Sequence, residues 1–162
     1  MKTSFFSVAT IALAFFFIGT LGSCKKDDKS KTELLTHHSW KVKAATINPA
    51  IDIFGTGELI SDLYANNFFY PACTKDDFMT FKDNGQVISD EGATKCSAGD
   101  PQTTTQNWTF NSTETVITIS ELDGSDPQSF NISSLTEDEV VISNSESIDN
   151  VVYTFTTTFE PK

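Results

Sequence analysis

Residues 77–90, DFMTFKDNGQVISD, contain the strongest local indication of the fold. Two short stretches rich in β-forming residues, 77–81 and 86–90, flank the dipeptide Asn84-Gly85. Asn-Gly is typical of a tight hairpin turn in which both central residues adopt positive φ. The segment therefore predicts two antiparallel strands joined by a two-residue turn.

Similar strand patterns occur once before this hairpin and repeatedly after it. Near the end of the chain, Val151, Tyr153, Phe155 and Phe159 share one face, whereas Val152, Thr154, Thr156, Thr158 and Glu160 share the other, as expected for a half-buried strand. Upstream, Trp40 and Val42 alternate with Lys41 and Lys43 in the same way. Turn-forming residues separate the segments. Besides the hairpin, the expected strands are 34–47, 106–110, 114–122, 128–135, 139–144 and 151–159.

The eight expected strands are joined mostly by tight turns, and no helical pattern is long enough to cover a sheet. An antiparallel meander has exposed edges unless its first and last strands pair. We therefore expect an all-β fold, a single eight-stranded antiparallel up-and-down β-barrel, with a two-sheet β-sandwich as the alternative. Residues 48–72 lack alternation and contain glycine and proline, so they predict a long loop, with one helical turn at 58–65.

The start of the chain has the composition of a secretory signal. Residues 1–23 contain a single charge, Lys2, and an apolar run that ends in small residues just before Cys24. The stretch LGSC, 21–24, resembles the lipobox of bacterial lipoproteins. The resemblance implies that 1–23 is a removed signal peptide and that Cys24 carries fatty acyl chains such as palmitate. An uncleaved membrane helix is the alternative.

The charged residues after this cysteine resemble the surface-export signal of Bacteroidetes lipoproteins. That signal places a lysine and two acidic residues shortly after the lipidated cysteine, and Lys26, Asp27 and Asp28 match it. The resemblance implies a lipid-anchored outer-membrane protein that faces the cell surface; a solvated tether is the alternative. The expected organisation is a signal peptide (1–23), a lipidated cysteine with a polar tether (24–33) and one domain (34–162).

The charge of the chain excludes one class of partner. Lys2 is one of 11 lysines, so the part after residue 23 has 10 lysines against 22 acidic residues, a net charge of −12, and no arginine. Affinity for nucleic acid comes mainly from phosphate neutralisation by Lys and Arg. A nucleic-acid partner is therefore excluded, whereas a cationic protein partner is compatible with this charge.

Two cysteines remain besides Cys24, and they predict a disulfide. An exported protein meets an oxidising environment, where an even number of cysteines favours pairing of Cys73 with Cys96. Two cysteines alone make a poor zinc site, because structural zinc takes four ligands. A bridge closing a loop of this length stabilises a fold by roughly 3 kcal/mol.

Residues 33–160 resemble the lipocalin-like domains of Bacteroidetes lipoproteins. The resemblance rests on LLTHHSWKV (34–42), PACTKDDFMTFKDNGQV (71–87) and DEGATKCSAGDPQTTTQNWTF (90–110). It implies a β-barrel that holds a small apolar ligand in its mouth. The sequence departs from typical lipocalins in having His38 where they have glycine, two residues before the first-strand tryptophan, and in lacking the arginine that stacks on that tryptophan.

Two functions are compatible with these features. The first is a non-enzymatic, membrane-anchored binding module for a small apolar ligand, although the same aromatic residues are also expected in a solidly packed core. The second is a protein-interaction module, an inhibitor or adhesin that engages a cationic protein. The sequence has no recognisable catalytic, metal-ligating or cofactor-binding motif. The candidate ligand-binding residues are Trp40, Phe68, Phe69, Tyr70, Trp108, Tyr153 and Phe155.

Overall fold

The structure, a computed structural model, describes residues 29–162. The expected signal peptide, Cys24 and the export residues 26–28 lie outside this part of the chain. None of the helices within residues 29–162 is both long and apolar enough to cross a bilayer.

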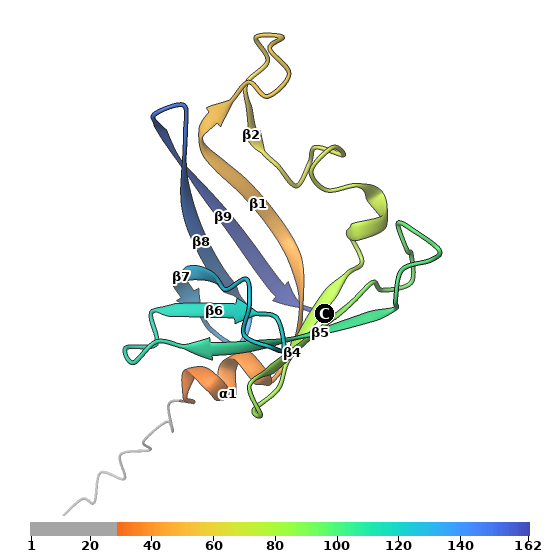
Figure 1. Cartoon of the computed structure of the whole chain (residues 1–162), viewed down its shortest axis with the longest axis vertical. Helices are drawn as coiled ribbons and strands as arrows, with labels where there is room; N and C mark the ends of the chain where they lie inside the picture. The colour runs from red at the N-terminus through yellow and green to blue at the C-terminus, as the bar shows by residue number, and fades with distance from the viewer. Residues whose placement is uncertain (1–28) are drawn as a thin grey trace, which may run out of the picture.

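Eight strands form a closed antiparallel barrel, which confirms the expected fold (Figure 1). Each strand pairs with its neighbour in chain order, and the last strand returns to pair with the first. A ninth strand, β2 (Ile60–Asp62), adds to the edge of the first. The barrel strands are β1 (Ser39–Ile51), β3 (Phe78–Phe81), β4 (Gln86–Asp90), β5 (Thr103–Phe110), β6 (Val116–Ser120), β7 (Gln128–Leu135), β8 (Val140–Ile148) and β9 (Val151–Pro161).

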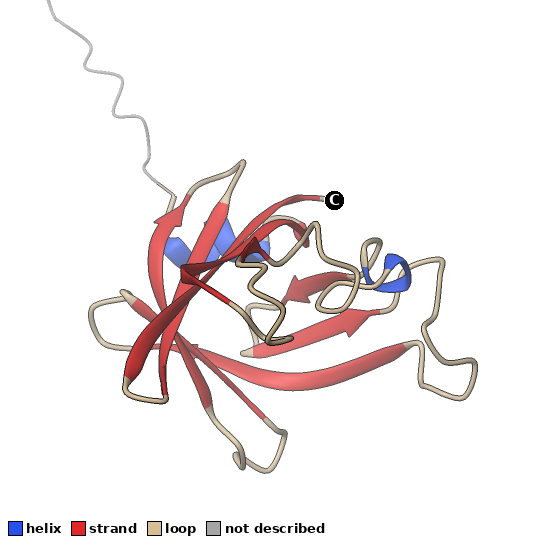
Figure 2. Cartoon of the chain, turned by 90° about the horizontal axis from the view of Figure 1, so that it is seen from above, coloured by secondary structure: helices blue, strands red, loops and turns tan. Residues whose placement is uncertain are grey.

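The long strand β1 divides the barrel into two halves. Its first residues, Ser39–Lys41, pair with β3, whereas Thr46 and Ile51 pair with β2 on the same edge. Its other edge pairs with β9. Because β3 and β4 are short, the second half of β1 has no full-length barrel strand beside it on the β3 side. Two long loops lie on the same side of the barrel (Figure 2). One joins β2 to β3 and contains the 3-10 helix η1 (Ala72–Thr74), and the other joins β4 to β5.

The β3–β4 hairpin is confirmed, but its two-residue turn is wrong. Lys82 N donates to Gln86 O and Gly85 N donates to Lys82 O, so the loop has three residues. Within it Gly85 alone has positive φ, at 81°, as in a type I turn closed by a left-handed glycine. A turn with two left-handed residues occurs instead between β8 and β9, where Asp149 and Asn150 have φ of 51° and 65°.

Two local expectations are corrected. Residues 31–36 form a helix, α1 (Lys31–Thr36), rather than the end of a tether and the start of the first strand. A capping box begins it, since Ser30 Oγ accepts from Glu33 N and the Glu33 carboxylate accepts from Ser30 N. The helical turn expected at 58–65 is also wrong, because Ile60–Asp62 is extended and pairs with β1.

Two apolar clusters fill the molecule. The lower cluster, at the α1 end in Figure 1, is built around Leu35, Trp40, Phe81, Val87, Trp108, Ile117, Val140 and Phe159. Leu35 of α1 is 2% exposed, so this short helix closes that end of the barrel. The upper cluster is built around Ala45, Ile47, Ile60 and Leu63, with aromatic side chains of the long loop and β9 packed against it.

Candidate functional site

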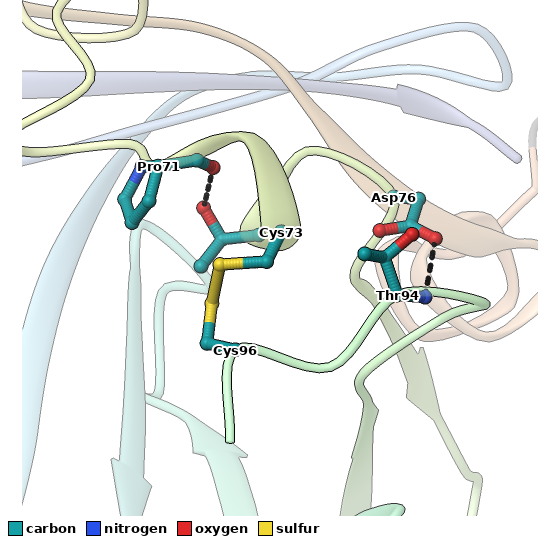
Figure 3. Close-up of a disulfide and its surroundings, with 6 residues drawn as sticks. Pro71, Cys73, Asp76, Thr94 and Cys96 are labelled. Carbon is teal, nitrogen blue, oxygen red and sulfur yellow. Dashed lines mark hydrogen bonds between the residues drawn. A yellow bond between two sulfur atoms is a disulfide. The ribbon is translucent and has the colours of Figure 1, made fainter. Parts of the chain in front are cut away.

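A disulfide joins the two long loops beside the barrel, as expected (Figure 3). Cys73 lies in η1 and Cys96 in the loop between β4 and β5, with their Cα atoms 5.1 Å apart. A second link lies close by, where one carboxylate oxygen of Asp76 accepts hydrogen bonds from Ala93 N (2.7 Å) and Thr94 N (3.0 Å). The loops are therefore fixed to each other by a covalent and a charge-assisted contact.

Glycine is required where the two loops meet. Gly92 has φ of 63°, and a Cβ atom built on it would lie 2.5 Å from the backbone oxygen of Asp76. A side chain at this position would meet fixed backbone in a conformation that L residues rarely adopt. The close approach allows the loop after β4 to fold back over the segment that enters β3.

A cavity of about 250 Å³ lies under these loops, between the two apolar clusters. The lower cluster contributes Trp40 and Phe159, and the upper cluster contributes Tyr70. The complete lining is Trp40, Val42, Tyr70, Thr74, Asp77, Phe78, Met79, Ser89, Asp90, Glu91, Pro101, Gln102, Thr104 and Phe159. The barrel interior proper is packed, since the void among the lower-cluster side chains is only about 20 Å³.

The apolar wall of the cavity is held rigidly. Trp40 is 1% exposed, and its Nε1 donates to the backbone oxygen of Leu35 at 2.7 Å. His38 packs edge-on against the same indole, with ring centroids 5.8 Å apart. Trp40 is therefore fixed by α1 and by its own strand, without the arginine that typical lipocalins stack on this residue. Trp40 thus forms a fixed support for the cavity, and the aromatic lining residues that keep accessible surface are Tyr70 and Phe78.

The other wall of the cavity is acidic. Asp77, Asp90 and Glu91 line it, and no lysine or histidine does. Asp90 already accepts hydrogen bonds from Gly92 N and Gln102 Nε2, at 2.9 and 2.8 Å. Asp77 differs, because its buried Oδ1 has no hydrogen-bond partner. Asp90 thus supports the loop, whereas Asp77 has a buried carboxylate oxygen that no protein donor satisfies.

The pKa values of the neighbouring residues Asp76 and Asp77 are shifted in opposite directions because their surroundings differ. Burial raises the pKa of Asp77, and the nearby carboxylates of Glu91, Asp76 and Asp90 raise it further. The hydrogen bond from Ala93 N is the main reason that the pKa of Asp76 is lowered. Backbone donors therefore favour the anionic form of Asp76, although its Oδ1 is also buried without a partner, whereas burial and the neighbouring carboxylates disfavour the anionic form of Asp77.

The structure brings two of the seven candidate ligand-binding residues to the cavity, Trp40 and Tyr70. Trp108 lies in the lower core, where its Nε1 donates to Lys82 O at 3.0 Å. Phe68 is 66% exposed and packs against Phe54 on the surface. The remaining three, Phe69, Tyr153 and Phe155, pack against the upper cluster.

The acidic residues of the cavity were absent from the expected site. The signal that identifies them is their position at paired strand ends. Phe78 of β3 is opposite Asp90 of β4, so Asp77 and Glu91 are the next residues outward on either side of the hairpin. Within residues 29–162, no group of three or more His, Cys, Asp or Glu side chains is placed to hold a metal ion.

The chain is similar to solved structures of bovine odorant-binding protein and to one family of sequences. The odorant-binding protein from bovine nasal mucosa is 13% identical, covering 85% of this chain and 77% of that one, with a TM-score of 0.41. A deswapped triple mutant of the bovine protein is 13% identical over 82% of this chain and 75% of its own, with a TM-score of 0.39. No curated protein matches the chain. The family model of the lipocalin-like domain matches residues 36–142, which is more than half of the sequence, and the chain therefore belongs to the lipocalin-like domain family.

Proposed function

We propose that this protein is a non-enzymatic binding module that holds a small ligand with an apolar body in the cavity beside Trp40. The observation that carries the proposal is the cavity of about 250 Å³ with a rigid aromatic wall. Ligand sites are typically concave and mostly apolar, with a few polar groups that fix orientation, and volumes start near roughly 300 Å³. A space slightly below that limit suits a ligand of about one aromatic ring with a short chain.

Filling the cavity should weaken this binding strongly. Ser89 lines the cavity from β4, so Ser89→Trp places an indole in the space that the ligand would occupy. With phenethyl alcohol as a neutral probe, the wild-type domain should show saturable binding in a titration followed by NMR. Ser89→Trp should weaken this binding at least tenfold (about 1.4 kcal/mol).

The matched control is Ser147→Trp, which adds the same side chain at an exposed residue of β8 outside the cavity. It should bind the probe as the wild type does. Absence of saturable binding to the wild type, or equal binding by both variants, would contradict a ligand site in this cavity.

The sequence before residue 29 supports a membrane location for this binding module. We propose that Cys24 is acylated after removal of residues 1–23, and that Lys26, Asp27 and Asp28 direct the protein to the outer surface of the outer membrane. Each buried CH₂ of an acyl chain contributes about 0.8 kcal/mol, and two or more chains hold a protein stably at a bilayer.

Replacing the acylated residue should release the protein from the membrane. We expect Cys24→Ser, expressed in a bacterium that acylates lipoproteins, to move the protein from the membrane fraction to the soluble fraction. Mass spectrometry of the wild-type product should show a chain that begins at Cys24 and carries fatty acid. A product that retains residues 1–23 would show that the segment is an uncleaved anchor.

A second candidate function is the binding of a cationic protein at the surface. The observation that favours it is a set of exposed apolar side chains, among which Phe54, Leu59 and Phe68 are 51%, 67% and 66% exposed. Such side chains on an acidic domain suit a partner with an apolar patch and basic surroundings. Because these residues lie outside the cavity, Ser89→Trp should leave capture of such a partner unchanged, which separates the two functions.

A further inference from the structure

The cavity combines two walls of different chemistry. Tyr70 and Phe78 provide partly exposed aromatic surface, Asp77 and Glu91 provide carboxylates, and the lining includes no cationic side chain. A purely apolar ligand would leave the carboxylates in a partly desolvated position without a partner, which is unfavourable. The lining therefore suits a ligand that is apolar at one end and positively charged at the other.

Strand register explains why the negative charges are close together. Asp77 directly precedes β3 and Glu91 directly follows β4, and the pairing of Phe78 with Asp90 makes them opposite each other across the hairpin. Like charges facing each other across paired strands are destabilising. An arrangement that costs stability in the unliganded fold becomes favourable when a cation binds between the charges.

Within residues 29–162, the side-chain carboxylates of Asp77 and Glu91 form no hydrogen bond or ion pair. Asp77 Oδ1 is a buried oxygen without a hydrogen-bond partner. Asp76 Oδ1 is also buried without a partner, but its Oδ2 accepts from two backbone N–H groups of the loop that follows β4, and Asp90 accepts from a third. The raised pKa of Asp77, caused by burial and then by the adjacent carboxylates, is consistent with an unbalanced negative site.

Two lysines are engaged by other groups near the cavity. Lys162 Nζ lies 3.1 Å from the centroid of the Phe78 ring, and Lys162 is not among the lining residues. Lys41, which is opposite Phe78 on β1, pairs with Glu160 at 3.1 Å. The acidic wall thus has no internal counter-ion among the residues that line the cavity.

We propose that the cavity selects amphipathic organic cations, that is, small amines whose apolar body packs on Tyr70 and Phe78, the partly buried aromatic residues of the lining, and whose ammonium group lies between Asp77 and Glu91. This inference rests on the proposed function, since it names the ligand class of the same cavity. Charge-assisted hydrogen bonds from the ammonium group to the carboxylates supply the selectivity.

The test compares two ligands of nearly the same shape. Phenethylamine and phenethyl alcohol differ at one polar end, where the amine is a cation at neutral pH. Calorimetric or NMR titration of the wild-type domain should give a dissociation constant about tenfold lower for the amine, the ratio expected from one charge-assisted hydrogen bond. Added salt should weaken amine binding and leave alcohol binding unchanged, because ions screen only the charged contact.

The double variant Asp77→Asn/Glu91→Gln should remove the preference, so that both ligands bind like the alcohol binds the wild type. The matched control, Asp83→Asn/Glu146→Gln, removes the same net charge from exposed positions outside the cavity and should keep the preference. If the alcohol binds but the amine binds no tighter, or if the preference survives in Asp77→Asn/Glu91→Gln, charge selection is wrong while the ligand cavity stands. If neither probe binds, the proposed function itself fails.

Discussion

Trp40→Ala is expected to lower the free energy of unfolding by about 3–5 kcal/mol, the range for deleting a large aromatic side chain from a core. Trp40 is 1% exposed and is among the largest fully buried side chains. Its loss would remove the contact surface on which Phe159 and Leu35 pack, and would leave the Leu35 backbone oxygen without its indole donor. The measurement is urea unfolding at equilibrium, followed by circular dichroism.

Two further variants separate the causes of this effect. Trp40→Phe keeps an aromatic ring but removes the donor, so it should show the cost of the unpaired Leu35 oxygen and of the smaller ring, about 1–3 kcal/mol. Phe68→Ala removes an aromatic side chain that is 66% exposed, and should cost less than about 1 kcal/mol. A loss below about 1 kcal/mol in Trp40→Ala would show that α1 and β1 are not coupled through this indole.

The barrel could be predicted because its strands have a period of two. Tyr153, Phe155 and Phe159 share one face of β9 and pack against the apolar clusters, whereas Val151 at the start of the strand is 41% exposed. Closure required a further physical argument, the need to pair the edges of a meander, and the pairing of β1 with β9 satisfies it. Helix α1 has no comparable period, because it is too short to show one. Its sequence signal was the capping box formed by Ser30 and Glu33.

The turns and the cavity were harder to predict for specific reasons. Asn84-Gly85 permits both a two-residue and a three-residue hairpin loop, and the choice is made by register, which here is set by the pairing of Phe81 with Val87. The cavity depends on how the loop after β2 folds against the loop after β4. Neither loop has a periodic pattern, so the contact between Asp76 and the backbone at 93–94 could not be inferred from spacing.

The disulfide provides the second large effect. Cys73→Ala/Cys96→Ala is expected to lower the free energy of unfolding by roughly 3 kcal/mol, from the chain-entropy estimate for a bridge between residues separated by 23 positions. The stabilisation acts mainly on the unfolded chain, whose freedom the bridge restricts. The wild-type protein treated with dithiothreitol should therefore unfold at the same urea concentration as the double variant, while the untreated protein unfolds at a higher one.

The native position of the two loops should nevertheless survive loss of the bridge, because Asp76 still accepts hydrogen bonds from Ala93 N and Thr94 N and Gly92 still permits their close approach. The double variant should then keep the probe affinity of the cavity within about twofold, a difference of less than half a kcal/mol. Combining it with Asp76→Ala should release the loops and weaken probe binding strongly. If the cysteine variant alone abolished binding, the bridge would be the element that shapes the cavity, and the carboxylate of Asp76 would have no independent role in placing the loop over it.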